Sequence, residues 1–409
     1  MSSSGRTPIC SATAVSLAAV GFTALTFAPD ANAGAVEVLL YTVGPGAELS
    51  QRYGHSLLCF RGIDGLNAVT SEAPIAGDLN SGTCFDFGIA VAQTPASFAW
   101  SMLRGHGRFV ATRISEKTAT LALTAQGRKL ESQRVPVSER DARALAGELG
   151  ALVDANWSYE YHPYWANCAT QLRDRLDRAL GGRLANVHLE QHQTFRELVE
   201  LGLSGQAPEL TLLALGLGSP DNDSIPSAWQ SQFLPTRLRD AMQSLGSEPQ
   251  VVNDPGDVTL PTSVNVGRAT LAVLALGLGV LLNWGSSALR ARRQWLATSV
   301  VGSCGLLTWS AALLCSFSEI RFNWALALLL PSDLFVPWLS SSRRSAYLAL
   351  RVVSSALLVL LNLAGAITQP LWAVGMLALL PLGSAWWQLR QPIHKPSDTT
   401  PETQTGLSA

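Results

Sequence analysis

Two residues far apart in the chain could form a nucleophile and its base: Cys168 in "YWANCATQLRDRL" and His55 in "QRYGHSLLCF". A thiol attacks a carbonyl carbon as the thiolate, and a helix N-terminus or a neighbouring imidazolium favours that form. Leu172 and Leu176 follow Cys168 at helical spacing, and Asn167 directly before it suits the N-cap position. The pattern therefore predicts Cys168 in the first turn of a helix, where backbone N–H groups could form an oxyanion hole.

Histidine is the usual general base for such a thiol. The first 245 residues contain five candidates: His55, His106, His162, His188 and His192. His188 and His192 lie in a polar stretch typical of a surface. His106 and His162 lie in loop-like segments. His55 begins an apolar, strand-like run, which would hold the ring more firmly than a loop. Taken alone, His55 fits a packed structural histidine as well as it fits a general base. The sequence spacing therefore does not decide which histidine is the base.

A metal site is the rival interpretation of cysteine and histidine together. The sequence contains no HExxH, CxxC or HxH pattern, so zinc would need scattered ligands. We therefore expect neither a metal nor a cofactor. The net charge of −1 gives no electrostatic reason to expect a nucleic-acid partner.

The segments around the two residues predict an α+β domain at residues 34–245. Antiparallel strands are expected in "VEVLLYTV", "HSLLCFRG", "TCFDFGIAVA", "GRFVATRIS", "TATLAL" and "KLESQRVPV". Helices are expected in "SERDARALAGELGALVDAN", with Ser138 as N-cap, in the segment after Cys168, and in "QTFRELVELGL". Residues 246–263 are polar and contain proline and aspartate, which predicts a linker.

The N-terminus and the cysteines indicate export. Residues 1–33 read as a signal peptide, with an apolar stretch and a small-residue cleavage site; an uncleaved anchor is the alternative. Of the six cysteines, Cys10 would leave with the signal and two lie in apolar segments. Cys59 and Cys84 lie in neighbouring strand-like runs and could form a disulfide. A disulfide to Cys168 instead would abolish its chemistry.

The last third of the chain is membrane-like. Charged residues are 14% of the protein, against roughly 25% in soluble domains. Five apolar runs are long enough to cross a bilayer: 264–284, 296–316, 323–340, 346–368 and 371–388, although four or six spans are also compatible. "RARR" and "SSRR" between runs predict cytoplasmic loops, which places residues 34–245 outside and the disordered tail 389–409 inside. Asp333 within the third run is either functional, as ionisable groups at that depth often are, or it pairs in the bundle or lies in a re-entrant break at Pro331.

Several motifs carry a resemblance to a known family. "GPGAELSQRYGHSLLCFR", "FDFG", "YEYHPYWANCATQLRDRLD", "TFREL" and "FLPTRLRDAM" occur in this order. Over residues 37–245 the chain thereby resembles the extracytoplasmic domain of the Lnb family, the lipoprotein intramolecular transacylases. "RFNWALALLLP" extends the likeness weakly into the membrane part. The resemblance implies a circularly permuted papain-like (NlpC/P60-like) fold, with His55 as base and Cys168 as nucleophile.

Further site residues follow from their places around these motifs. Asp86 of "CFDFG" could orient the imidazole, although an exposed aspartate at a strand end is equally compatible. The candidate substrate-binding residues are Glu48, Tyr53, Asn167, Arg173 and Asn323. For Arg173 an ion pair with Asp174 is the preferred interpretation. Glu319 and Arg321 would face the membrane interface beside Asn323. The sequence departs from the expected family pattern at Gln171, where arginine is expected, and in the extra pair Cys59 and Cys84.

These observations predict a multi-pass protein of the bacterial inner membrane with a periplasmic thiol domain. The function expected is transfer of an acyl chain to the N-terminus of a lipoprotein, with a lipid or lipoprotein substrate. The alternatives are a cysteine amidase or peptidase that cleaves cell-wall peptides, and a non-enzymatic membrane scaffold.

Overall fold

A seven-stranded antiparallel sheet forms the centre of the exported domain. The computed structural model describes residues 36–63, 66, 82–218, 220–256, 265–284 and 290–391, so the predicted signal peptide and most of the predicted tail lie outside it. The strand order is β6-β4-β3-β2-β1-β5-β7. The strands are β1 (Glu37–Val43), β2 (His55–Arg61), β3 (Thr83–Ala90), β4 (Arg108–Ser115), β5 (Leu130–Arg134), β6 (Ser158–Glu160) and β7 (Gln250–Asn253). With the helices around the sheet, this confirms the predicted α+β class.

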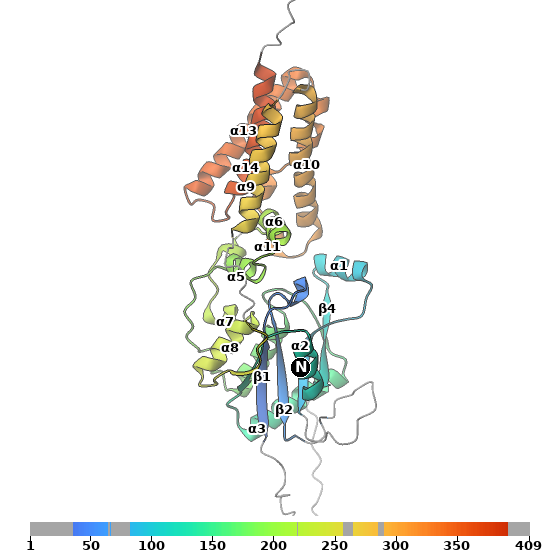
Figure 1. Ribbon diagram of the computed structural model, residues 1–409, viewed down its shortest axis with the longest axis vertical. Helices are drawn as coiled ribbons and strands as arrows, with labels where there is room; N and C mark the ends of the chain where they lie inside the picture. The colour runs from blue at the N-terminus through green and yellow to red at the C-terminus, as the bar shows by residue number, and fades with distance from the viewer. Residues whose placement is uncertain are drawn as a thin grey trace, which may run out of the picture. The chain divides into compact units, whose positions relative to one another are not determined.

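Both faces of the sheet are covered, which explains why β1 and β2 are almost continuously apolar. Successive side chains of a strand point to opposite faces. On one face Leu40 and Leu58 pack with helices α3 (Glu139–Asp154), α4 (Cys168–Ala179) and α8 (Pro235–Ser244). On the other face Leu39 and Leu57 lie in a second cluster, which Leu123 of helix α2 (Glu116–Ala125) covers. Figure 1 shows β1 and β2 side by side in the domain.

The second cluster contains the one disulfide of the described residues. Cys59 and Cys84 are directly opposite each other in the β2–β3 register, and their sulfur atoms are bonded. Cys168, Cys304 and Cys315 are free thiols. The disulfide therefore leaves Cys168 unbonded.

Two elements differ from the sequence prediction. "TATLAL" is part of helix α2 and not a strand, because the Ser115 hydroxyl accepts from Thr118 N–H and caps the helix. Glu116 in its first turn is held by Arg61 of β2. The predicted linker at 246–263 contains β7, where Val251 and its neighbours pair with the edge strand β5. Both cases depend on tertiary pairing that local patterns do not record.

The remaining helices of the exported part are short. They are α1 (Pro95–Leu103), α5 (Phe195–Gly202), α6 (Ala207–Gly216) and α7 (Ala228–Ser231), with 3₁₀ turns η1 (Leu49–Gln51) and η2 (Asp221–Asp223). The predicted caps are confirmed, since Ser138 accepts from Asp141 N–H and Asn167 from Thr170 N–H. In α4 the Thr170 hydroxyl also accepts from the Asn167 backbone N–H, which completes a capping box.

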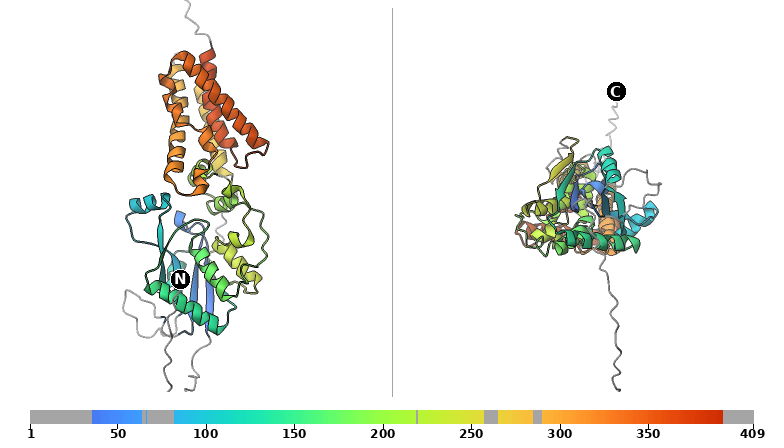
Figure 2. Two further views of the ribbon diagram at one scale, coloured as in Figure 1. Left: turned by 180° about the vertical axis from the view of Figure 1, so that it is seen from behind. Right: turned by 90° about the horizontal axis from the view of Figure 1, so that it is seen from below.

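Four long helices form the membrane part: α9 (Val266–Asn283), α10 (Arg290–Leu314), α13 (Ser341–Leu363) and α14 (Trp372–Arg390). Both vertical views show them side by side (Figures 1 and 2). Within the described part of the chain, α9, residues 292–314 of α10, and α13 are long and apolar enough to cross a membrane. Alanine and leucine side chains from these helices share one buried cluster.

The predicted span at 323–340 is not one continuous helix. After α10 the chain forms α11 (Ser318–Arg321), α12 (Ala325–Leu328) and the 3₁₀ segment η4 (Pro331–Trp338). Pro331 begins η4, and Pro337 lies inside it, where proline lacks the N–H of a regular helix. Asp333 is completely buried and pairs with Arg351 of α13 at 2.9 Å. Both structural interpretations of Asp333 therefore hold: the segment is broken at the proline, and the carboxylate is paired.

Candidate active site

Packing of β2 against α4 brings His55 and Cys168 together. His55 is the first residue of β2 and Cys168 the first of α4. Leu58 of β2 and Leu172 of α4 lie in the same core, so burial of the two apolar faces fixes the ends of both elements relative to each other. His55 Nδ1 lies 3.2 Å from Cys168 Sγ. This distance is within hydrogen-bonding range for a thiol and an imidazole.

Asp86 on the neighbouring strand β3 holds the other ring nitrogen. Its Oδ1 lies 2.8 Å from His55 Nε2 and also accepts a hydrogen bond from Gly88 N–H at 2.6 Å. The β3–β4 register shifts between Asp86 and Ile89, which places Gly88 in the irregular part of the strand. A Cβ atom on Gly88 would collide with the His55 ring. The glycine of "FDFG" therefore leaves room for the imidazole.

The surroundings of His55 and Asp86 shift the pKa values of both side chains. Burial opposes a charge on His55, but the Asp86 carboxylate and the Cys168 sulfur outweigh it and raise the pKa of His55 well above its ordinary value. Burial opposes the charge on Asp86 as well, and His55 together with the Gly88 N–H lowers the pKa of Asp86 below its usual range. The side chains of His55 and Asp86 are only 18% and 14% exposed. An imidazolium in this position stabilises negative charge on the sulfur.

The start of α4 adds the helix dipole to the same sulfur. Cys168 occupies the first helical position, where the backbone N–H has no acceptor within the helix. Asn167 Oδ1 accepts from Thr170 N–H, and Asn167 Nδ2 donates to the carbonyl groups of Pro163 and Phe233. These bonds fix the first turn. The positive end of the helix therefore faces the reacting atoms.

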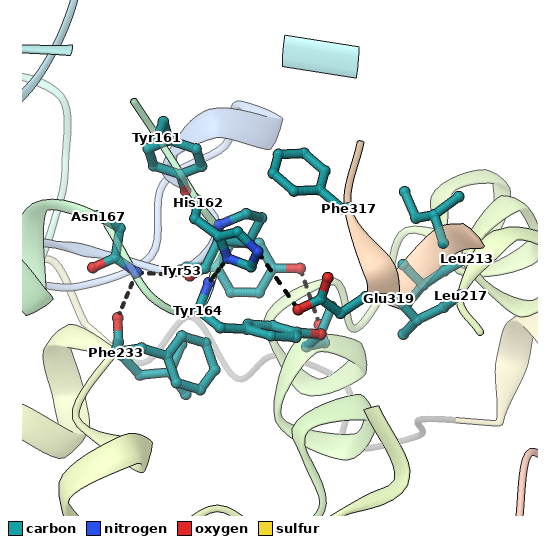
Figure 3. Close-up of a pocket in the computed structure, with 14 residues that line it drawn as sticks. Tyr53, Tyr161, His162, Tyr164, Asn167, Leu213, Leu217, Phe233, Phe317 and Glu319 are labelled. Atoms are coloured by element: carbon teal, nitrogen blue, oxygen red, sulfur yellow. Dashed lines mark hydrogen bonds and ion pairs between the residues drawn. The ribbon is translucent and has the colours of Figure 1, made fainter. Parts of the chain in front are cut away.

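An apolar pocket of about 280 Å³ begins beside the two chain segments that carry these residues (Figure 3). Asn167, adjacent to Cys168, and Tyr53, two residues before His55, both line it. The other walls come mostly from aromatic and leucine side chains of the exported part and from the α11 region: Tyr161, Pro163, Tyr164, Val199, Leu213, Leu217, Phe233, Leu234, Phe317 and Ile320. A histidine and a carboxylate complete the lining, His162 and Glu319.

The candidate substrate-binding residues occupy different settings. Tyr53 lines the pocket and donates its hydroxyl to Val199 O at 3.1 Å. Glu48 is exposed at the start of η1 and accepts from Gln51.

Arg173 and Asn323 are engaged in the protein's own contacts. Arg173 forms the expected ion pair with Asp174 at 2.7 Å and stacks on Trp229. Asn323 is buried; its Nδ2 donates to Leu215 O, and its Oδ1 accepts from Ala325 N–H and the Gln369 amide.

Sequence reasoning did not identify two features near the site: the role of Gly88 and the pairing of His162 with Glu319. Gly88 donates its backbone N–H to Asp86, and it is the glycine of the motif "FDFG", which could have indicated this role. His162 and Glu319 approach each other at 3.6 Å, and no local pattern links residues so far apart. Among the described residues, no group of three or more histidine, cysteine, aspartate or glutamate side chains is arranged to hold a metal ion.

The comparisons with known proteins point to one family. Residues 26–200 match the family model described as the Lnb N-terminal periplasmic domain. No curated protein and no solved structure is significantly similar to the chain. The match covers β1 to α4 and therefore includes His55, Asp86 and Cys168. The chain therefore carries an Lnb N-terminal periplasmic domain, followed by helices long and apolar enough to cross a membrane.

Proposed function

We propose that the protein is a membrane-anchored cysteine acyltransferase that transfers an acyl chain to the N-terminal amine of a lipoprotein at the outer face of the membrane. One observation carries the proposal: Cys168 Sγ lies 3.2 Å from His55 Nδ1, while Asp86 holds His55 Nε2 at 2.8 Å. A nucleophile, a base and an orienting carboxylate in this order are the arrangement of thiol acyl transfer.

The reaction would take two steps. In the first, the Cys168 thiolate attacks an ester carbonyl of the lipid, the C–S bond forms and the C–O bond breaks. His55 gives its proton to the departing alkoxide, which leaves as an alcohol. In the second, a neutral amine attacks the thioester, the C–N bond forms and the C–S bond breaks. His55 takes the proton from nitrogen, which restores the imidazolium and the thiolate.

The surroundings support an ester of a lipid as substrate. The pocket beside the site is lined mainly by apolar side chains, which suits an acyl chain better than a peptide of the cell wall. The membrane helices hold the domain where lipid esters lie, and this raises their local concentration. Of the predicted contacts, Tyr53 remains our candidate for positioning substrate, since it lines the pocket.

We also propose that the domain has a circularly permuted papain-like fold. The support is the order of its parts: a histidine and its carboxylate on neighbouring strands of an antiparallel sheet, followed by the cysteine at a helix N-terminus. The helix and the sheet share one core, as a single domain of this kind requires.

The function can be tested in cells that lack other lipoprotein N-acylation. Full-length protein is expected to produce N-acylated lipoprotein N-termini, detected by mass spectrometry, and Cys168→Ala is expected to produce none. Wild-type protein should also carry an acyl group on Cys168 when it is mixed with a diacylglyceryl lipopeptide. Unmodified lipoproteins and no S-acyl Cys168, or cleavage of cell-wall peptides in their place, would contradict the proposal.

A further inference from the structure

The pocket in Figure 3 contains one acidic side chain, and its hydrogen bonding is incomplete. The Glu319 side chain is 5% exposed. Its Oε2 accepts from the Ser318 hydroxyl at 3.1 Å, but the donor nearest to its Oε1 in the ion-pair contacts, His162 Nε2, lies at 3.6 Å, beyond normal hydrogen-bond distance. A buried carboxylate oxygen without a donor is costly, so such an atom in a pocket indicates a missing donor from a ligand.

The partner of Glu319 is a histidine whose tautomer the backbone determines. His162 Nδ1 accepts hydrogen bonds from Tyr164 N–H at 3.2 Å and Trp165 N–H at 3.4 Å. Nδ1 is therefore the unprotonated nitrogen, and Nε2 carries the hydrogen that faces Glu319 Oε1 at 3.6 Å.

Glu319 is negatively charged in this setting. Burial opposes its charge, but the interaction with His162 prevails and lowers the pKa of Glu319 below its usual value. Among the described residues no lysine or arginine forms an ion pair with Glu319, whose neighbour of this kind is the His162 imidazole at 3.6 Å. The pocket thus presents a fixed negative charge within an apolar lining. A ligand with one positive group and long apolar chains complements both features.

The backbone holds Glu319 in place without a ligand. Its carbonyl oxygen accepts from Gly218 N–H at 2.6 Å and from Asn222 Nδ2 at 3.0 Å. Asn222 is itself completely buried and accepts from the Tyr164 hydroxyl. A Cβ on Gly218 would collide with the backbone of Phe322, so the close approach of the two segments needs the glycine. The position of the carboxylate is thereby preorganised.

We propose that Glu319, supported by His162, binds the ammonium group of the acceptor, the free N-terminus of a lipidated protein. This rests on the proposed acyl transfer and adds the residue that positions its acceptor. An ammonium has three N–H donors, one of which would satisfy Oε1. The bound ammonium loses one proton to water, which leaves the neutral amine that attacks the thioester, while Glu319 stays ionised. The second proton passes from nitrogen to His55.

The experiment separates the two half-reactions in full-length protein reconstituted in vesicles. A diacylglyceryl lipopeptide with an acetylated N-terminus can donate an acyl group but cannot accept one, so it reports S-acylation of Cys168 alone. The same lipopeptide with a free N-terminus reports transfer. For Glu319→Gln we expect S-acylation at the wild-type rate, and transfer to the free amine reduced about 10- to 100-fold through loss of a charge-assisted bond.

A matched control exists in the exposed pair His106–Glu160, which joins the same two residue types at 3.3 Å. Glu160→Gln is expected to leave both rates unchanged. Wild-type transfer by Glu319→Gln would overturn the inference, and so would equal loss of S-acylation and transfer, since Glu319 would then serve the fold or the first step. Absence of S-acyl Cys168 in the wild type would overturn the proposed function itself, which is a different result.

Discussion

Two pairs of a histidine and a carboxylate in the described part of the chain, His55–Asp86 and the partly buried His162–Glu319, differ in how completely the carboxylate is hydrogen-bonded. Asp86 Oδ1 receives two donors at 2.8 and 2.6 Å, from His55 and Gly88. Glu319 Oε1 meets its histidine at 3.6 Å and has no hydrogen-bond donor among the described residues. The first pair is complete within the protein, whereas the second is completed by a ligand donor.

The free nitrogen of each histidine shows the same difference. In the first pair the carboxylate binds Nε2, so Nδ1 faces the Cys168 sulfur and can exchange a proton with it. In the second pair backbone N–H groups bind Nδ1, so His162 has no nitrogen left for chemistry and can only orient the carboxylate. A histidine becomes a base when its second nitrogen meets a reacting group, and a support when that nitrogen is bound by the backbone.

Removal of the sulfur should have the largest effect. Cys168→Ala is expected to reduce acyl transfer more than about 1000-fold, because no covalent intermediate can form. The rate of acyl-lipopeptide formation, followed by mass spectrometry, measures this. Cys304→Ala, which removes another free thiol from a membrane helix, is the matched control and should retain the wild-type rate. Equal loss in both variants would contradict a special role of Cys168.

Asp86→Asn should have the next largest effect and a specific pH signature. We expect a loss of about 100- to 10,000-fold, since the ring loses its orienting carboxylate. Asp86 raises the pKa of His55, so its removal lowers that pKa. As the pH rises, the imidazolium of the variant would then lose its proton at a lower pH than in the wild type. The alkaline limb of the kcat/KM profile should therefore shift to lower pH. Asp154→Asn, at an exposed carboxylate, should leave the profile unchanged. An unshifted limb in Asp86→Asn would contradict the assigned coupling.

The first pair was predictable from the sequence and the second was not. Cys168 follows an N-cap and precedes leucines at helical spacing, and His55 and Asp86 lie in apolar runs that pair as neighbouring strands. These are local patterns, supplemented by the order of family motifs. His162 and Glu319 lie 157 positions apart in segments with no shared pattern, and only tertiary packing brings them together.

The fold shows the same limit. Helices α9, α10, α13 and α14 follow from long apolar runs, and α9, α10 and α13 are long and apolar enough to cross a membrane. The break at 323–340 depends on Pro331 and on the pairing of Asp333 with Arg351. A hydropathy average over this run conceals the proline and the buried ion pair, and it therefore predicts one continuous span. Helix α2 was missed for a related reason, since Glu116 finds Arg61 and Tyr41 only after the sheet has formed.

Gly88→Ala should have an intermediate effect on the first pair. The new methyl group would meet the His55 ring and displace it from Asp86. Small displacements of catalytic groups cost up to about 100-fold, and we expect a loss of 10- to 100-fold in kcat with little change in KM. Gly147→Ala in helix α3 is the control, because its new methyl group meets no atom within 4 Å. Activity in Gly88→Ala equal to that of the control would show that the ring does not need this space.

The disulfide should affect catalysis least, although it joins the two strands that carry the first pair. Cys59 and Cys84 lie a few residues from His55 and Asp86 on β2 and β3. The hydrogen-bonded register between these strands and the core beneath them also hold the pair, so the bond is not required for its geometry. For Cys59→Ala/Cys84→Ala we expect transfer at 25 °C within about twofold of the wild type. The free energy of unfolding should fall by about 2–4 kcal/mol, measured as a lower Tm, because the unfolded chain loses a constraint. A large loss of activity with an unchanged Tm would contradict this. It would mean that the hydrogen-bonded geometry of His55 and Asp86 depends on the disulfide and not on strand pairing.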